Sequence, residues 1–116
     1  KYTKQTTFGK DDQRSYNRNG EAFDKGETFS GVDFETGLQA DAELKTLFGT
    51  DDIIPYALKC ILMHDAVTSV IRGASQSSQV THNISAAQIP NLTAAQMDGV
   101  IKIYNTYIRS QVHQNW

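Results

Sequence analysis

The chain has 116 residues, of which 39% are hydrophobic and 21% charged, and its formal net charge at pH 7 is −2. These values are typical of one soluble globular domain with a modest core, and the near-neutral charge argues against a polybasic nucleic-acid-binding protein. No apolar run reaches the ~18 residues of a membrane span, nothing at the N-terminus resembles a signal peptide, and the lone Cys60 cannot form an internal disulfide, so we expect a cytoplasmic protein with no nucleic-acid or membrane partner.

Residues 1–31 are polar and without hydrophobic periodicity, and their aromatic residues are isolated. A structureless stretch of this length in a compact domain is normally a functional lid or a disordered tail. Six basic residues are balanced by five acidic ones, so the segment forms no net basic patch. The sequence therefore predicts a long loop, either a functional lid or a disordered tail.

Residues 32–66 predict two helices. In the first, Gly49 stands where a C′ glycine ends a helix. Its apolar residues recur at helical spacing and are Phe34, Leu38, Ala42, Leu44, Leu47 and Phe48. In the second, residues 50–52 offer N-cap oxygens and Pro55 suits the first turn. A wide apolar face follows, so we expect the second helix to be largely buried.

No group of residues has the spacing of a metal site or a catalytic pair. Cys60 lies in the middle of a predicted helix with His64 one turn later. A thiol becomes a nucleophile only when a base or a positive helix end lowers its pKa, whereas buried thiols are usually packing residues. The remaining His and Asp residues are scattered without metal-ligand spacing. We therefore expect neither catalytic residues nor metal ligands in this chain.

A strand, a small-residue turn and a helix start follow one another after residue 66. Residues 67–71 alternate β-branched side chains and predict one short β-strand. The chain breaks at Gly73, and the free N–H groups and positive dipole end of the next helix favour anion binding. The Ser75 hydroxyl can cap the helix, and Gln79 and Asn83 share one helical face. We predict a phosphate-binding turn; the alternative is an ordinary serine-capped turn.

Residues 89–116 predict a C-terminal helix and tail. Pro90 breaks the chain, and Thr93 with Gln96 makes a capping box. An apolar stripe at helical spacing then runs from Met97 to Ile108. Such a stripe usually packs on its own protein, and a helix that binds a partner's groove is the alternative.

Several motifs stand in an order that resembles a known family. The chain reads ALKCIL from Ala57, IRGA from Ile71, QVTHN from Gln79 and IPNL from Ile89, and it ends at Trp116. This order is similar to the C-terminal end of a bacterial aldo/keto reductase, with its ALxWIL helix, IPGA strand end, QxxxN helix, L/I-P-x-L link and last helix ending near a Trp. The resemblance extends back through KYTKQTTF and NRNGEAFDKGETFSG, over almost the whole chain.

The resemblance implies a C-terminal fragment of a (β/α)8 TIM barrel, mainly α with one short β-strand. The parent protein would reduce aldehydes or ketones with NADPH. Residues 1–31 would cover the cofactor, residues 67–71 would form the last barrel strand, and residues 72–88 would hold the adenosine-phosphate end of NADP. The implied cofactor-binding residues of this partial site are Lys1, Arg14, Arg72, Gly73, Ser75, Gln79 and Asn83.

The chain also departs from the family pattern. Arg72 replaces the usual Pro and adds a positive charge suited to a 2′-phosphate, and His82 occupies a position that is often acidic. The family's catalytic Asp, Tyr, Lys and His belong to the first half of the barrel and have no counterpart here. We therefore expect an inactive chain that needs the missing N-terminal barrel half or another copy of itself. The alternative is a self-standing helical module for oligomerisation or partner binding, without catalysis.

Overall fold

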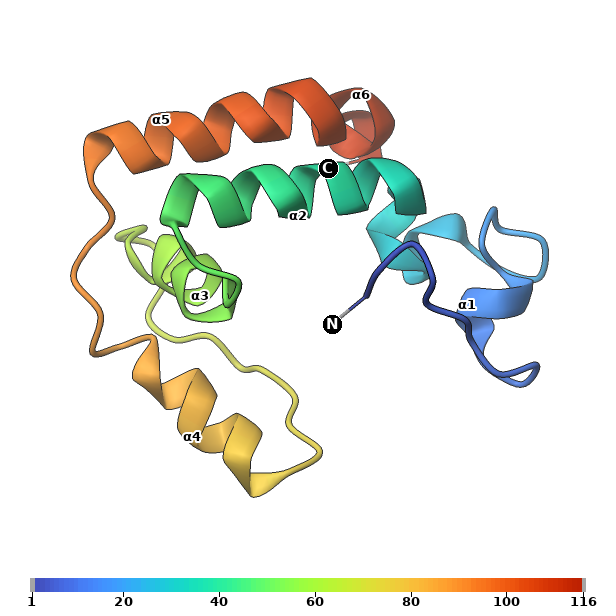
Figure 1. Ribbon diagram of the computed structural model, residues 1–116, viewed down its shortest axis with the longest axis horizontal. Helices are drawn as coiled ribbons and strands as arrows, with labels where there is room; N and C mark the ends of the chain where they lie inside the picture. Colours follow the sequence, from blue (N-terminus) through green and yellow to red (C-terminus); the bar gives the residue numbers. More distant parts are fainter. Residues whose placement is uncertain (1, 116) are drawn as a thin grey trace. The chain divides into compact units, whose positions relative to one another are not determined.

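The computed structural model describes residues 2–115, and all regular secondary structure within them is helical (Figure 1). The α-helices are α1 Gln13–Tyr16, α2 Phe34–Phe48, α3 Ile54–Leu62, α4 Ser77–Ser85, α5 Ala94–Ile103 and α6 Arg109–Val112. The 3₁₀ turns are η1 Lys25–Glu27, η2 Phe29–Gly31 and η4 His113–Asn115, and the π-helical turn is η3 Tyr104–Ile108. None of the helices in this part of the chain is both long and apolar enough to cross a membrane.

The chain forms two compact units. One unit, here called the terminal unit, combines the residues up to Glu43 with those from Ile101 onward, and the other, the central unit, runs from Leu44 to Val100. The central unit holds the predicted phosphate turn. The terminal unit holds the long polar segment that begins the chain.

Residues 67–71 do not form the predicted β-strand. They belong to a connection between α3 and α4 (Figure 1), and no strand occurs anywhere from residue 2 to residue 115. A β-strand is held by hydrogen bonds to a neighbouring strand, so alternating side chains alone cannot fix one. The predicted fold class is therefore confirmed in its helices and wrong in its strand.

Two helix ends form as predicted. At the end of α2, Gly49 has a φ of +64°, and the Thr50 N–H donates to the Lys45 carbonyl at 3.1 Å, which is the bonding pattern of a Schellman motif. Before α5, the Thr93 N–H donates to Gln96 Oε1 at 2.9 Å, and the Gln96 N–H donates to Thr93 Oγ1 at 3.2 Å. The C′ glycine and the capping box are both confirmed.

The start of α3 differs from the prediction. Its N-cap residue is Ile53, which makes no side-chain cap bond, although Pro55 does lie in the first turn. The Thr50 hydroxyl instead accepts the Asp52 N–H at 3.1 Å, within the preceding turn. Polar residues in a short connection satisfy one another locally, and the helix begins after them.

In the central unit α3 packs against α4, and Gly99 of α5 lies against Leu47 of α2. Leu58, Ala86 and Leu92 are buried. A Cβ atom placed on Gly99 would lie 2.7 Å from Leu47 Cδ1, so the glycine provides the space that this leucine side chain fills. The apolar faces predicted for α2 and α3 thus contribute to the interior of this unit.

The predicted C-terminal stripe is only partly buried. In the terminal unit Ile103 and Val112 are buried, whereas Ile101 is 54% exposed, and the Tyr107 hydroxyl donates to Glu43 Oε1 at 2.6 Å. The π-helical turn η3 contains more residues per turn than an α-helix, so a 3.6-residue period does not extend across it. The Tyr107 hydroxyl is thus bound within its own unit, while Ile101 of the same stripe stays exposed, and the alternative of a partner-binding stripe stays a prediction.

The polar segment that begins the chain folds around a buried amide. Asn17 is completely buried, and its Oδ1 accepts the N–H groups of Ala22 and Phe23, each at 2.9 Å. Its Nδ2 donates to the hydroxyl of Thr28, which is also buried, at 3.1 Å. A single side chain thereby closes a loop of polar residues, so within the described residues this segment is neither structureless nor a simple tail.

Candidate functional site

The predicted phosphate turn lies in the central unit, between the connection that follows α3 and the start of α4. Gly73 is exposed, its φ is not left-handed, and a Cβ atom built on it would meet nothing within 4 Å. The chain bends two residues later, at Ser75 and Gln76, rather than at the glycine itself. The backbone at Gly73 therefore faces open space, and no neighbour among residues 2–115 requires a glycine at this position.

Gln79 closes the turn from inside. Its Oε1 accepts the Ser75 N–H at 2.7 Å and the Ser75 hydroxyl at 3.2 Å. The predicted serine cap does not form, because the N-cap residue is Gln76 and it makes no side-chain bond. The N–H groups of Ser77 and Ser78 have no acceptor in the described part of the chain, as expected of a first helical turn. The Gln79 amide oxygen thus occupies the two donors of Ser75 and leaves the N–H groups of Ser77 and Ser78 open to an anionic oxygen.

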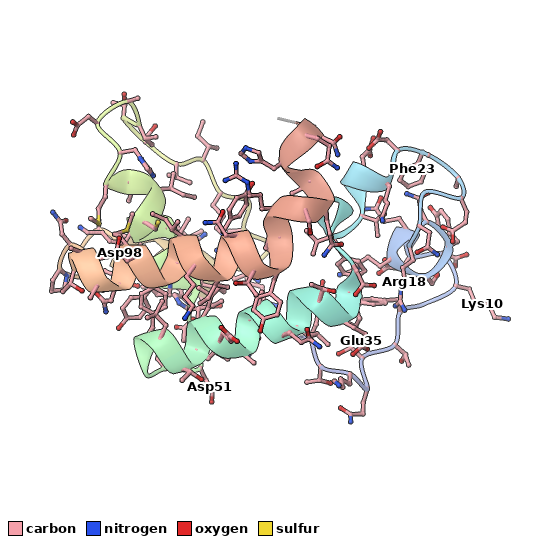
Figure 2. The ribbon with its side chains drawn as sticks, turned by 90° about the horizontal axis from the view of Figure 1, so that it is seen from above. Lys10, Arg18, Phe23, Glu35, Asp51 and Asp98 are labelled. Atoms are coloured by element: carbon pink, nitrogen blue, oxygen red, sulfur yellow. The ribbon has the colours of Figure 1, made fainter. Side chains whose placement is uncertain are left out.

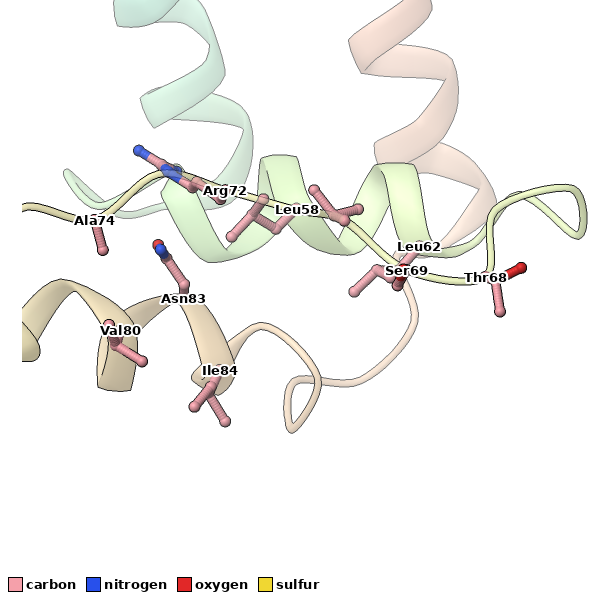
Figure 3. A pocket seen from close by; sticks show the side chains of 10 residues that line it. Leu58, Leu62, Thr68, Ser69, Arg72, Ala74, Val80, Asn83 and Ile84 are labelled. Atoms are coloured by element: carbon pink, nitrogen blue, oxygen red, sulfur yellow. The ribbon is translucent and has the colours of Figure 1, made fainter.

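A groove of about 320 Å³ lies beside the turn (Figure 3). Its apolar lining comes from Leu58, Leu62, Val70, Val80 and Ile84. Arg72 and Asn83 also line it, and Figure 3 shows Asn83 projecting from α4 toward the connection that carries Arg72. The structure therefore brings Arg72 and Asn83 together at one groove, and Ser75 and Gln79 together in one turn.

The remaining two predicted cofactor residues fall in the terminal unit or outside the described residues. Arg14 donates from Nε to Asp12 Oδ1 at 2.7 Å and also bonds the other carboxylate oxygen through Nη2. Its guanidinium group lies over the Phe8 ring, 4.7 Å from the centroid, and contacts the hydroxyl of Tyr2. Lys1 lies outside the described residues. Arg14 is thus engaged by a carboxylate and two aromatic rings rather than free.

Other basic side chains of this segment are differently placed. Lys10 is exposed and extends away from its neighbours into solvent (Figure 2). Arg18 lies over the ring of Phe34, 5.1 Å from its centroid. Lys10 and Arg18 therefore do not join Arg14 in a cluster of positive charge among the described residues.

The ion pair between Asp12 and Arg14 should make the stability of the folded chain depend on pH. Hydrogen bonds from Arg14 lower the pKa of the Asp12 carboxyl from 3.8 to about 2. Because the lowered pKa belongs to the folded state, the stabilisation is present above about pH 4 and is lost as the pH falls toward 2. We expect the Asp12 carboxyl carbon to titrate near pH 2 by NMR, and the substitution Arg14→Gln to raise its midpoint toward 3.8.

The matched control for this prediction is Arg18→Gln, which removes the same charge from a side chain that has no contact with Asp12. The Asp12 midpoint should stay near 2 in that variant. A midpoint near 3.8 in the unsubstituted chain would contradict the ion pair.

A contact that the sequence does not indicate joins the start of α3 to α4. His82 Nε2 lies 2.8 Å from Asp52 Oδ2, without the alignment of a hydrogen bond. The carboxylate can therefore form an ion pair with a protonated imidazole. The two residues are far apart in sequence, so no local pattern could have predicted the pair.

Cys60 is a packing residue. Its Sγ contacts Met97 Sδ at 3.8 Å, and burial raises the pKa of the thiol, which disfavours the nucleophilic thiolate. Among the described residues, no group of three His, Cys, Asp or Glu side chains is arranged to hold a metal ion. The polar groups presented by the turn and the groove of the central unit are backbone N–H groups, the Arg72 guanidinium group and the amides of Gln79 and Asn83.

Comparison with known proteins identifies one family. A model described as the aldo/keto reductase family matches residues 1–105 of the 116-residue chain. No curated protein and no solved structure matches the chain. The matched range includes the turn at Ser75, the groove beside it and Arg14.

Proposed function

Because the chain belongs to the aldo/keto reductase family, we propose that it is the C-terminal, cofactor-binding part of an enzyme that reduces aldehydes or ketones with NADPH. Members of this family generally use nicotinamide cofactors, and their fold is a TIM barrel. In such barrels, phosphate sites often form at the loops after the last two strands, beside a helix N-terminus. The turn before α4 is the part of this chain that suits such a site.

The observation that carries the proposal is the open turn beside Arg72. The backbone at Gly73 faces free space, and the N–H groups of Ser77 and Ser78 are available at a helix end that carries partial positive charge. A 2′-phosphate would find these donors together with the exposed guanidinium group of Arg72. This chemistry favours NADP over NAD.

The amides would act in sequence as the nucleotide binds. A phosphate oxygen would replace Gln79 Oε1 at the Ser75 N–H, and the freed Gln79 amide could then bind the adenosine. Asn83, on the same groove as Arg72, would supply a second amide.

The site proposed here is partial. Lys1 and Arg14 belong to it by family resemblance alone, and the chain holds no counterpart of the family's four catalytic residues. We propose that the missing N-terminal part of the barrel completes the enzyme in the cytoplasm, and that the isolated chain does not oxidise NADPH with a carbonyl substrate. The lone, unpaired Cys60 agrees with a reducing compartment.

Binding of adenosine 2′,5′-bisphosphate tests the proposal directly. We expect the nucleotide to shift the NMR amide signals of Gly73, Ser75 and Ser77. Arg72→Ala should weaken binding about tenfold, because one charge-assisted bond to a phosphate is lost. Gly73→Val should leave stability unchanged, since its side chain meets open space, but should block the approach of the phosphate.

Two comparisons make this test decisive. Arg109→Ala, which removes an exposed arginine of the terminal unit, should bind the nucleotide like the unsubstituted chain. Adenosine 5′-monophosphate, which lacks the 2′-phosphate, should bind more weakly, and equal affinities would point to NAD instead. Signal shifts outside the turn, or full binding by both Arg72→Ala and Gly73→Val, would contradict the proposed site.

A further inference from the structure

An exposed turn of the terminal unit contains the only asparagine of the chain that precedes a glycine. Asn19 and Gly20 lie in the loop between Arg18 and Phe23 (Figure 2), and Asn19 is exposed. The Gly20 N–H donates to the Asn17 carbonyl at 3.3 Å, which closes a β-turn. A hydrogen bond of this length holds the N–H only weakly, so the nitrogen that follows Asn19 is open to chemistry.

The turn requires a glycine after Asn19. Gly20 has a φ of +83°, and a Cβ atom placed on it would lie 3.1 Å from Lys25 Cβ and 3.3 Å from the Lys25 backbone nitrogen. Glycine adopts this conformation without steric cost, whereas other residues rarely do. Because a glycine has no side chain, the Gly20 nitrogen is also unshielded. The fold itself therefore keeps this peptide bond accessible to the neighbouring amide.

Glu21 holds the Asn19 side chain beside the same peptide bond. Glu21 Oε1 accepts Asn19 Nδ2 at 2.8 Å, and Glu21 Oε2 accepts the Asn19 N–H at 2.9 Å. Hydrogen bonds, above all from the Asn19 N–H, lower the pKa of the Glu21 carboxyl, so this acceptor is ionised at neutral pH. Both bonds bridge Gly20 and restrict the amide of Asn19 to its neighbourhood.

We propose that Asn19 is a site of spontaneous deamidation and that its isoaspartyl product opens the loop that Asn17 closes. The Gly20 nitrogen loses its proton to hydroxide and bonds to Asn19 Cγ, and the Cγ–Nδ2 bond breaks as ammonia leaves with a proton from water. The cyclic succinimide then adds water. Cleavage between Cγ and the Gly20 nitrogen gives aspartate, and cleavage between the Asn19 carbonyl carbon and that nitrogen gives isoaspartate. Water is consumed, ammonia is released, and nothing is oxidised or reduced.

The two products act differently on the loop. Aspartate keeps the backbone and only places a carboxylate where an amide now donates to Glu21. Isoaspartate carries the main chain through the former side-chain carbons, which lengthens the path from Asn17 to Ala22. The N–H groups of Ala22 and Phe23 both donate to Asn17 Oδ1 at 2.9 Å. Hydrogen bonds weaken steeply when their geometry changes, so isoaspartate should release both N–H groups.

Several other asparagines lack this combination of exposure and a glycine neighbour. Asn17 is completely buried, and Asn83 and Asn105 lie within helices, whose regular backbone hinders ring closure. Asn91 is exposed and lies outside the helices, but the next residue is the buried Leu92. Asn91 is therefore the internal control for Asn19.

Incubation of the folded chain at mildly alkaline pH, followed by peptide mapping with mass spectrometry, tests the chemical step. We expect a mass increase of about 1 Da at Asn19, together with a new negative charge. This change should appear at least about tenfold faster at Asn19 than at Asn91, because only the former precedes an unshielded nitrogen. An isoaspartyl methyltransferase should label the same position. Asn19→Gln keeps an amide that can reach Glu21 but disfavours ring closure, and it should abolish both signals at this position.

Amide exchange tests the effect on the loop. Exchange at Ala22 and Phe23 should become about tenfold faster in the isoaspartyl form. Freshly prepared Asn19→Asp, which has the new charge without the longer backbone, should keep the slow exchange of the unsubstituted chain.

Equal rates at Asn19 and Asn91 would overturn the proposed site. Deamidation of Asn19 in urea but not in the folded chain would overturn it as well, because the turn would then protect the amide. An isoaspartyl form that exchanges Ala22 and Phe23 as slowly as the unmodified chain would overturn the proposed opening of the loop.

Discussion

Replacing Asn17 with alanine is expected to lower the free energy of unfolding of the terminal unit by about 3 kcal/mol, because the buried Thr28 hydroxyl and two part-buried N–H groups lose their partner, at ~1–3 kcal/mol for a fully buried group and less for a part-buried one. The side chain is completely buried, and its Oδ1 is the acceptor for the N–H groups of both Ala22 and Phe23. Its Nδ2 also holds the buried hydroxyl of Thr28. An alanine fills none of these positions, so three polar groups lose their partner together.

Urea unfolding and amide exchange at Ala22 and Phe23 measure this effect. Exchange at both amides should become fast in Asn17→Ala, even under conditions in which the rest of the chain stays folded. The control is Asn19→Ala: Asn19 is exposed and its side chain donates to the exposed Glu21, so its loss should change stability by less than ~0.5 kcal/mol. Equal stabilities of Asn17→Ala and Asn19→Ala would contradict the role of the buried amide.

The role of Asn17 could not be predicted from the sequence. Asn17 stands among polar residues, and nothing in its neighbourhood distinguishes a buried asparagine from a solvated one. Its role depends on where the chain places Ala22, Phe23 and Thr28, which is tertiary information. A segment without hydrophobic periodicity can therefore still be ordered, when a polar side chain supplies the bonds that a regular element would have provided.

The elements predicted correctly are those whose signals are local. Gly49 ends α2 because a glycine tolerates the left-handed backbone of a Schellman motif, and Thr93 with Gln96 starts α5 through bonds three residues apart. The strand at residues 67–71 was wrong because its stability would depend on a neighbour that is not among residues 2–115. Local patterns specify helices well and strands only together with their partners.

In the candidate site, too, the features with a local signal were predicted and those that depend on a particular partner were not. The turn before α4 was predicted from small residues and serines next to a helix start; its residues are exposed in the structure, and phosphate binding there stays a prediction. The details differ, since Gln79 rather than a serine hydroxyl closes the turn and the bend lies beyond Gly73. The bonds between Arg14 and Asp12 were not predicted, because balanced charges in a polar segment do not reveal which of them will pair.

Gln79→Glu is expected to weaken the binding of adenosine 2′,5′-bisphosphate about 10- to 100-fold, or ~1.4–2.8 kcal/mol, without destabilising the chain. A glutamate oxygen can accept the same Ser75 N–H that the amide oxygen now accepts. A negative charge in the first turn of α4 also interacts favourably with the helix dipole, by ~0.3–1 kcal/mol. The same charge, however, repels a phosphate and competes with it for the same donors.

Gln79→Glu should therefore keep or raise the stability of the chain while it lowers the affinity for the nucleotide. A variant that disrupted the turn would lower both. Thermal unfolding measures the first quantity and calorimetric titration with the nucleotide measures the second. Gln79→Ala separates the effect of charge from the loss of the amide, and its affinity should lie between those of the unsubstituted chain and Gln79→Glu. Gln39→Glu, the same change at an exposed position of α2, should leave the affinity unaltered. If Gln79→Glu bound the nucleotide as tightly as Gln39→Glu, the phosphate would have to bind away from the Ser75 N–H, and the turn before α4 would be no more than a capped helix start.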